Sequence, residues 1–255
     1  MTGPQDVLAR LEQYYDTVPR STGTDEQVGP FTNFVPGSVP TWTFYARPRL
    51  GLTDELTPED VQRVLDRRVE LGLPRSIEWV DEVTPSLLPA VNAAVGDLTG
   101  CYPLLVRRPD PAPPEQARTT VMTPDHPDLA SAIGAIGASF GGTDDYTPAE
   151  LSAQPRLIET GGLIIVAAYD ADGAVVGGGS TAPRGEVTEL MGIGILPRAR
   201  GAGLGTASTQ ALVRAAMRTG VTTIFLSAAS DGAASIYRRV GFEDVGTACI
   251  LELDD

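Results

Sequence analysis

The sequence predicts an α/β (α+β) protein of two domains, with helices flanking a mixed sheet. The clearest sign is an apolar, strand-like run at 190–195, a glycine-rich turn at 200–206 and a helical run at 204–218, in direct succession. A second sign is that residues 31–106 and residues 187–253 both follow the order strand, helix, strand, helix, strand. The composition agrees, because 255 residues with 42% hydrophobic and 20% charged content suit one large or two modest globular domains.

The first domain is predicted over residues 1–108. It opens with an amphipathic helix, because apolar residues recur at helical spacing from Val7 to Tyr15. A loop rich in Ser, Thr, Gly and Asp is expected to follow as far as Gly29. Residues 31–47 then predict one or two strands around a turn at 36–38. These strands are marked by aromatic side chains, which suit a pleated surface: Phe31, Phe34, Trp42, Phe44 and Tyr45.

The next helix carries clear start and stop signals. Thr57 is predicted to cap it, Pro58 to be its first residue, and Asp60 to complete a capping-box pattern. Gly72 is the stop signal, since glycine readily adopts the left-handed conformation that ends many helices. The predicted apolar face consists of Val61, Val64, Leu65 and Val69.

A strand at 77–83, a helix opening at 84–85 and a strand at 102–106 complete the first domain. Residues 109–115 are rich in proline, which predicts a stiff, extended linker. This linker marks the predicted boundary, so the second domain is expected over residues 116–255.

The second domain is predicted to open with a strand at 119–122 and a helix at 127–139. A loop rich in glycine and aspartate follows at 141–146. Residues 147–150 resemble another helix start, and that helix is expected to end near residue 160.

A hairpin is predicted next, from strands at 163–169 and 175–181. Residues 170–173 between them read Asp-Ala-Asp-Gly, a strong turn signal. Three successive glycines at 177–179 weaken the second strand and predict a bulge or a close approach by another backbone. The remaining elements are expected in the order strand 187–195, helix 204–218, strand 222–228, helix 232–239 and strand 245–253.

The chain carries a net charge of −14. This charge argues against nucleic acid and anionic membranes as partners, because binding phosphate groups needs positive charge. It is compatible with a cationic acceptor such as an amine. No apolar run approaches the length of a membrane span, and the first residues lack a signal-peptide pattern, so a cytoplasmic location is expected.

Cysteine and histidine are too few for a conventional zinc site. Cys101 and Cys249 are far apart with apolar neighbours, so two reduced core thiols are expected rather than a disulfide. The one histidine, His126, lies in a Pro-Asp-His-Pro segment that no nucleophile elbow accompanies. Neither a metal nor a Ser/His/Asp hydrolase is therefore expected.

The turn Arg200-Gly201-Ala202-Gly203-Leu204-Gly205-Thr206 has the features of an anion site. The first turn of a helix has amide groups without partners, and the helix dipole places positive charge there. Glycines let such a backbone approach phosphate oxygens closely. The pattern is neither the phosphate loop of nucleotide hydrolases nor the dinucleotide fingerprint Gly-x-Gly-x-x-Gly. A pyrophosphate cradle is predicted, and a glycine-rich turn without a ligand is the alternative for this segment alone.

Together with a second motif, this turn resembles motif A of the GNAT superfamily, the acyl-CoA-dependent N-acyltransferases. Residues 230–242 look like GNAT motif B, in which a helix carries a tyrosine (Tyr237 here) and ends in Gly-Phe. The family usually has Asn where this chain has Ser230. The resemblance covers roughly residues 118–255. It implies a GNAT fold, a mixed and mostly antiparallel sheet flanked by helices.

The resemblance implies direct transfer of an acetyl group from acetyl-CoA to a primary amine of a small molecule or peptide. Tyr237 would be the general acid toward the leaving thiolate, and a core tyrosine is the alternative. Glu189 would be the base, directly or through water, with Glu186 as its substitute or no single base at all. The residues implied in cofactor binding are Ile193, Gly194, Ile195, Arg200, Gly201, Ala202, Gly203, Leu204, Gly205, Thr206 and Ser230.

The matching element order also suggests that the N-terminal half is a degenerate GNAT-like copy; an unrelated α/β domain is the alternative. Its strand-to-helix connection, residues 46–59, has no Gly-x-Gly-x-Gly, so it is not expected to bind a cofactor. The alternative function is a non-catalytic acyl-CoA-binding sensor or assembly module, and a hydrolase on a similar fold is the third. A monomer or homodimer is expected.

Overall fold

The computed structural model describes residues 4–37 and 44–253, so the predictions for Ser38 and Trp42 lie outside the described residues. The chain forms two compact units that are not continuous in sequence. Unit 1 comprises residues 1–105, 227–234 and 244–255, and unit 2 comprises residues 106–226 and 235–243. The predicted linker boundary at 109–115 stays a prediction, and the segment forms no helix or strand.

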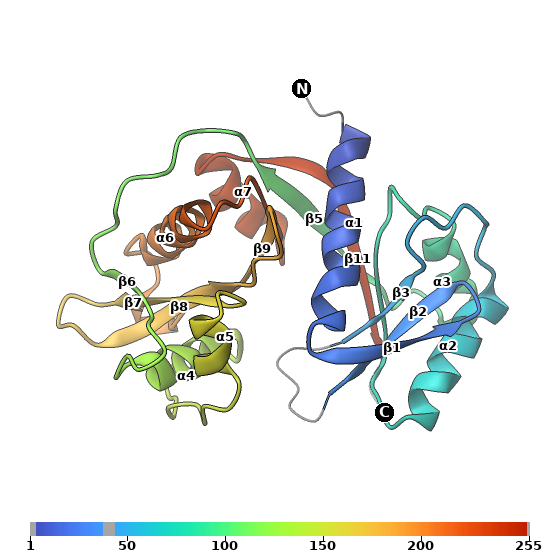
Figure 1. The fold of residues 1–255 in the computed structure, drawn as a ribbon, viewed down its shortest axis with the longest axis horizontal. Coiled ribbons are helices and arrows are strands. Elements are labelled where there is room, and N and C mark those ends of the chain that lie inside the picture. Colours follow the sequence, from blue (N-terminus) through green and yellow to red (C-terminus); the bar gives the residue numbers. More distant parts are fainter. Residues whose placement is uncertain (1–3, 38–43, 254–255) are drawn as a thin grey trace. The chain divides into compact units, whose positions relative to one another are not determined.

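Unit 1 is a sheet with helices on both faces (Figure 1). Its strands follow the order β1-β2-β3-β4-β11-β5, in which β3 and β4 are parallel and the pairs β1–β2, β2–β3 and β4–β11 are antiparallel. Its elements are α1 (Pro4–Arg20), β1 (Gly23–Val28), β2 (Phe31–Pro36), β3 (Ala46–Pro48), α2 (Pro58–Glu70), β4 (Arg75–Val80), α3 (Leu87–Val95), β5 (Gly100–Arg107) and most of β11 (Phe242–Leu253).

The two faces of this sheet differ in chemistry. One face packs against α2 and α3, and the buried side chains of Phe31, Ala46, Ile77 and Trp79 belong to that core. Because side chains alternate along a strand, the intervening residues face the other way. Phe34 on that second face lies 5.4 Å from the guanidinium of Arg20 on α1. The second face therefore lies under α1.

The helix starting at Pro58 confirms its predicted capping signals. Thr57 accepts a hydrogen bond from the Asp60 amide at 3.3 Å, and the Asp60 carboxylate accepts one from the Thr57 amide at 3.2 Å. Gly72 has a φ of +67°, as the predicted stop requires. Within the predicted apolar face, however, Val69 is 54% exposed, so that assignment was wrong.

Arg68 takes the buried position next to Val69. Its guanidinium is fully buried and donates to the Pro74 carbonyl at 2.6 Å and to Asn33 Oδ1 at 2.8 Å. It donates further to the Phe44 carbonyl and to Ser76 Oγ. Burial lowers the pKa of Arg68 to about 10. A charged residue can occupy a helix face meant for the core when neutral oxygens satisfy its donors.

Two local predictions in the N-terminal half need correction. The polar stretch before Gly29, expected as a loop, contains β1. Among the described strands, β1 pairs only with β2 and is the first strand in the order of unit 1. A polar sequence is compatible with an edge strand, because one side of its backbone faces outward. The cysteines expected as reduced thiols form a disulfide between Cys101 and Cys249. They lie on β5 and β11, adjacent strands that bring their Cα atoms to 4.3 Å across 148 residues of sequence.

Unit 2 contains the strand order β10-β9-β8-β7-β6, in which only the pair β9–β10 is parallel. Helix α6 packs on one face of these strands and α4 on the other (Figure 1). The elements are β6 (Thr119–Val121), α4 (Leu129–Phe140), α5 (Gln154–Glu159), β7 (Ile164–Tyr169), β8 (Val175–Thr181), β9 (Val187–Ile195), a 3₁₀ turn (Pro197–Ala199), α6 (Leu204–Arg218) and β10 (Thr223–Ser227); α7 (Asp231–Arg239) is shared between the units.

The helix predicted from 147 to 160 is much shorter, because α5 covers only Gln154–Glu159. The Ala149 amide donates to the Ala130 carbonyl on α4 at 2.9 Å instead of starting a helical turn. Gly134 on α4 makes this approach feasible, since a Cβ there would overlap the Thr147 carbonyl. The contact with α4, rather than the local sequence pattern, therefore determines the backbone conformation near Ala149.

The two halves of the chain share one strand arrangement. β1-β2-β3-β4 and β7-β8-β9-β10 each show two antiparallel pairings followed by one parallel pairing. In each half a helix, α2 or α6, connects the two parallel strands. This is the order that an internal duplication requires, and the duplication itself stays a hypothesis. Within the described residues, no helix is long and apolar enough to cross a membrane.

Candidate functional site

Strand β9 is bulged and separates from β10 before it ends. It pairs with β10 only from Val187 to Glu189, although the strand continues to Ile195. On its other side β9 pairs with β8, where Met191 lies opposite Ser180 and Gly194 lies opposite Gly178. The chain advances three residues on β9 but only two on β8 between these pairs, so β9 holds one extra residue. Beyond Glu189, the described residues of β10 no longer pair with this part of β9.

The glycines around the bulge are required by close backbone contact. A Cβ at Gly177 would overlap the Gly194 carbonyl, and one at Gly178 would overlap the Val166 carbonyl. A Cβ at Gly194 would in turn overlap Ser139 Oγ at the end of α4. The bulge or close approach predicted at 177–179 is therefore confirmed, and it brings the last residues of β9 against α4.

The glycine turn after β9 forms a row of unpaired backbone donors. Gly201 and Gly203 have φ values of +79° and +77°, and a Cβ on either would meet no atom within 4 Å. The first hydrogen bond of α6 runs from the Ala207 amide to the Gly203 carbonyl at 3.0 Å. Among the described residues, no acceptor is recorded for the amides from Gly201 to Thr206. Six successive N–H groups at a helix N-terminus make an anion site.

Arg200 holds the turn in place as well as adding positive charge. Its Nε donates to the Ile195 carbonyl at 2.9 Å and its Nη2 to the Ser139 carbonyl at 2.8 Å. These bonds tie the turn to the end of β9 and to the end of α4. The sequence implied that Arg200 binds the cofactor and gave no sign of this positioning role.

Two further contacts orient the turn. The Arg198 amide donates to the Asp144 carboxylate at 2.8 Å, and Arg118 Nη2 donates to the Ala202 carbonyl at 3.2 Å. Arg118 itself has an unusual φ of +65°. It lies 84 residues before Ala202 in the sequence, which is why no local pattern points to it.

A cavity of about 620 Å³ opens at this turn. Five of its lining residues were not among the predicted cofactor residues, namely Ser139, Phe140, Ala199, Ile236 and Arg239. The last two are three residues apart on α7, so the helical phase of motif B is the signal that would have found them. The predicted cofactor residues that line it are Ile193, Gly194, Ile195, Arg200, Gly201, Gly203, Leu204, Gly205 and Thr206; Ala202 lies in the same turn without lining the cavity.

Tyr237 and Glu189 are not among the residues that line the cavity. The Tyr237 ring packs edge-on against Phe242, with the ring centroids 6.1 Å apart. Burial raises the pKa of the Tyr237 phenol. Glu189 is the last residue of β9 that pairs with β10, so it stands where the two strands part. Glu186, its proposed substitute, is exposed just before β9.

Ser230 has a structural role in the described structure. Its Oγ accepts a hydrogen bond from the Ala233 amide at 3.2 Å, at the first turn of α7. Such a bond satisfies one of the donors that a helix start leaves unpaired. A contact between Ser230 and a cofactor stays a prediction.

The chemistry of the cavity suits a diphosphate. Six unpaired amides and the guanidinium groups of Arg200 and Arg239 present only hydrogen-bond donors and positive charge. Positive φ angles and open space at Gly201 and Gly203 leave room for phosphate oxygens beside the backbone. The residues present therefore fit the pyrophosphate of a coenzyme A.

Residues 137–242 match the model of the acetyltransferase (GNAT) family. Among solved structures, a GCN5-related N-acetyltransferase from Kribbella flavida is similar over 97% of this chain and 96% of its own, at 23% identity and a TM-score of 0.72. A GCN5-related N-acetyltransferase-like protein from Streptococcus suis matches over 98% of this chain and 100% of its own, at 12% identity and a TM-score of 0.57. These likenesses show a shared fold. A search with the sequence finds no match among curated proteins.

Proposed function

We propose that this chain, whose residues 137–242 match the acetyltransferase (GNAT) family model, transfers an acetyl group from acetyl-CoA to a primary amine of a small molecule or peptide. The family supports acyl transfer in general. The observation that carries the proposal is the row of six unpaired amides, which lies at a cavity beside the bulged end of β9. The net charge of −14 agrees with a cationic acceptor.

In this proposal the turn positions the donor. The amides from Gly201 to Thr206 bind the diphosphate, and Arg200 and Arg239 add charge-assisted contacts. Acetyl-CoA supplies the activated thioester when it is bound. The edge of β9 that faces away from β8 beyond Glu189 offers backbone groups to the pantetheine arm, and an amide near Gly194 is the proposed donor to the carbonyl oxygen. Such an oxyanion donor is worth roughly 2.7–4 kcal/mol.

Tyr237 and Glu189 are the proposed acid and base. A general acid must carry its proton when the thiolate leaves, and the raised pKa of Tyr237 keeps the phenol protonated at neutral pH. Glu189 stands where β9 leaves β10, and it removes the ammonium proton directly or through a water. Both residues lie outside the cavity lining, so the proposal requires them to reach the site from its edge.

Thiol release tests the proposal. Purified protein is mixed with acetyl-CoA and a panel of primary amines, and free thiol is followed with a chromogenic disulfide. We expect amine-dependent release, with the acetylated amine detected by mass spectrometry. If CoA binds in calorimetry but no amine in a broad panel is acetylated, catalysis is the wrong assignment and cofactor binding is the right one.

The second candidate is an acyl-CoA-binding module without catalysis. Two observations favour it: Tyr237 packs against Phe242, and neither proposed catalytic side chain lines the cavity. This module would need the glycine turn and neither side chain. It would bind acetyl-CoA with equal affinity in the wild-type protein and in a Tyr237→Phe, Glu189→Gln double variant, and neither would release thiol.

A further inference from the structure

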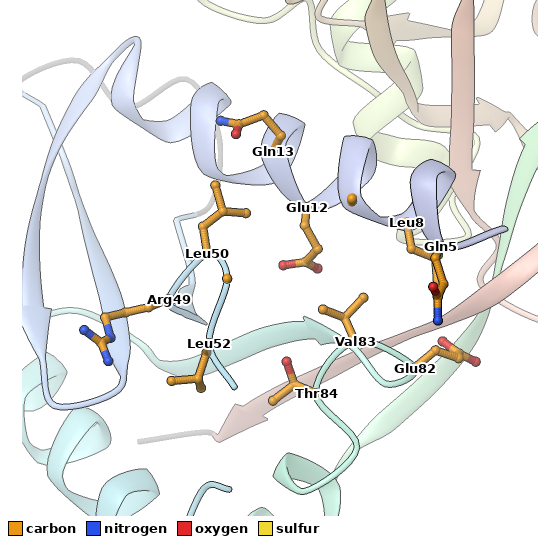
Figure 2. Close-up of a pocket in the computed structure, with 12 residues that line it drawn as sticks. Gln5, Leu8, Glu12, Gln13, Arg49, Leu50, Leu52, Glu82, Val83 and Thr84 are labelled. Atoms are coloured by element: carbon orange, nitrogen blue, oxygen red, sulfur yellow. The ribbon is translucent and has the colours of Figure 1, made fainter. Parts of the chain in front are cut away.

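A second cavity lies wholly within unit 1 and plays no part in the proposed acyl transfer. Its volume is about 460 Å³, which is in the range of small-molecule pockets. Figure 2 shows that α1 closes one side, while the segments after β3 and after β4 close the others. Much of the wall is apolar, with Leu8, Leu50, Leu52 and Val83 among the lining residues.

One buried carboxylate points into this cavity. Glu12 extends from α1 into the space between Leu52 and Val83 (Figure 2). Its side chain is only 9% exposed. Oε1 accepts a hydrogen bond from Arg47 Nη2 at 3.3 Å, and no partner of Oε2 is recorded among the described residues. A buried carboxylate with an available oxygen favours a hydrogen-bond donor, above all a charged one.

Arg47 does not balance the negative charge here. Its guanidinium also pairs with Glu78, whose side chain is 16% exposed, and lies 4.0 Å from the ring of Tyr15. Two carboxylates therefore share this one cation. Burial raises the pKa of Glu78; the positive charge of Arg47 opposes this rise, and the nearby Glu12 carboxylate adds to it.

The other charged residues that line the pocket do not make its charge positive. The Arg49 side chain points away from Glu12 (Figure 2). Glu82 adds negative charge at the side of the pocket, where it accepts hydrogen bonds from the amide and hydroxyl of Thr247 at 2.8 and 3.0 Å. The pocket thus combines apolar walls with uncompensated carboxylate charge.

The position of the pocket in the fold supports a ligand role. It lies beyond the ends of the parallel strands β3 and β4, as the unit 2 cavity lies beyond the end of β9. Ligands of α/β sheets gather at the carboxyl ends of parallel strands. Here, however, the helix that follows β3 is capped by its own Thr57 and Asp60, so its first turn offers fewer free donors to phosphate.

We propose that this pocket binds a small amphipathic amine, an apolar body carrying one ammonium group that pairs with Glu12. The apolar walls take the body of the ligand, and the carboxylate selects its charge. Anionic ligands are excluded by the same carboxylate. This inference does not rest on the proposed acyl transfer.

Calorimetry on the full chain tests the proposal with 4-phenylbutylamine, 4-phenylbutyrate and 4-phenylbutanol as probes of one shape. We expect the amine to bind with one site per chain, and the carboxylate to bind at least tenfold more weakly. Glu12→Gln should weaken amine binding about tenfold, while Glu55→Gln, the same change at an exposed position of unit 1, should leave it unchanged.

A second variant keeps the test decisive if Glu12→Gln fails to fold. Leu50 is 45% exposed at the cavity, so Leu50→Trp should fold and fill the pocket, removing binding of amine and alcohol alike. Glu189→Gln changes the proposed catalytic base in unit 2. This variant should not alter binding of the amine if the amine occupies the unit 1 pocket rather than the acceptor site. Amine binding that survives Leu50→Trp, or equal binding of amine and carboxylate, or no binding at millimolar amine, would each overturn the proposal.

Discussion

Gly203 shows how a single residue can set the chemistry of the site. It is the residue directly before α6, its φ is +77°, and a side chain there would project into open space at the cavity. A β-branched residue at such a backbone angle costs roughly 1–3 kcal/mol, and its side chain would occupy the room meant for phosphate.

Gly203→Val is therefore expected to weaken CoA binding by at least about tenfold, roughly 1.4 kcal/mol. Isothermal calorimetry with CoA measures this. Gly173→Val is the matched control, because Gly173 has a similar φ of +82° with open space in the β7–β8 turn. The pyrophosphate assignment is wrong if the Gly203 variant, folded like the control, binds CoA as the wild type does.

Tyr237 makes a second prediction at the residue scale. If the phenol is the general acid, Tyr237→Phe lowers turnover by roughly 10²-fold or more and leaves CoA affinity within about twofold. Tyr169→Phe is the control, since the Tyr169 hydroxyl donates to Asp128 at 3.1 Å and has no proposed catalytic role. Steady-state kinetics and calorimetry give both values; unchanged turnover removes Tyr237 from the mechanism.

The raised pKa of Tyr237 fixes the sign of one pH effect. An ordinary phenol loses its proton near pH 10, and burial moves this loss to higher pH. The acid therefore stays in its active form as pH rises, and no fall in kcat below about pH 10 should come from Tyr237. A fall below that pH must come from another group, as comparison with the Phe variant would show.

At the scale of elements, two helices that follow parallel strands differ at their first turn. Helix α2 begins with a capping box in which Thr57 and Asp60 satisfy each other's amides. Helix α6 begins after Gly203, with no side-chain cap, and its first amides stay unpaired. The first arrangement stabilises a helix, and the second keeps the donors available to a ligand.

Removing the cap of α2 should thus lower stability without touching the cofactor site. Thr57→Ala is expected to cost about 1 kcal/mol in the free energy of unfolding, measured by urea denaturation. Thr53→Ala, at an exposed position before the helix, is the control and should change little. CoA binding should remain as in the wild type for both variants. An unchanged midpoint for Thr57→Ala would contradict the capping role.

At the scale of the molecule, unit 1 depends on the end of the chain. Strand β11 pairs with β4 from Ala248 to Leu253, and Cys249 and Leu251 are fully buried in the core formed with α2 and α3. Residues 1–105 alone would expose this core and leave an edge of β4 unpaired.

A fragment of residues 1–108 is accordingly expected not to unfold cooperatively, as followed by circular dichroism and one-dimensional NMR. In the full chain, Leu251→Ala should cost about 2–5 kcal/mol, because it empties a buried position. Thr247→Ala, at a half-buried position four residues earlier on β11, serves as a milder comparison. A sharp, cooperative transition for the fragment would show that the first half folds without β11.

Local patterns predicted most of the elements well. Helix α6 begins and ends where the periodicity placed it, and the hairpin β7–β8, the capping box of α2 and the glycine approach at β8 are all present. These features depend on residues within a few positions of one another. The misses, by contrast, come from distant partners: Ala130 replaces the helix start near Ala149, and Arg68 finds acceptors from three other segments.

What the sequence determined by itself is the strand, glycine turn and helix around residues 190–218, because their pattern and the backbone freedom of glycine are local properties. Only the tertiary structure decided which residues from distant parts of the sequence complete the site. It brings Ser139, Arg118 and Arg239 to the turn or its cavity, and it pairs β11 with β4. Such contacts depend on the order of the strands in the sheet. This order brings together segments that are far apart in the sequence, and no local sequence pattern indicates that they will be neighbours.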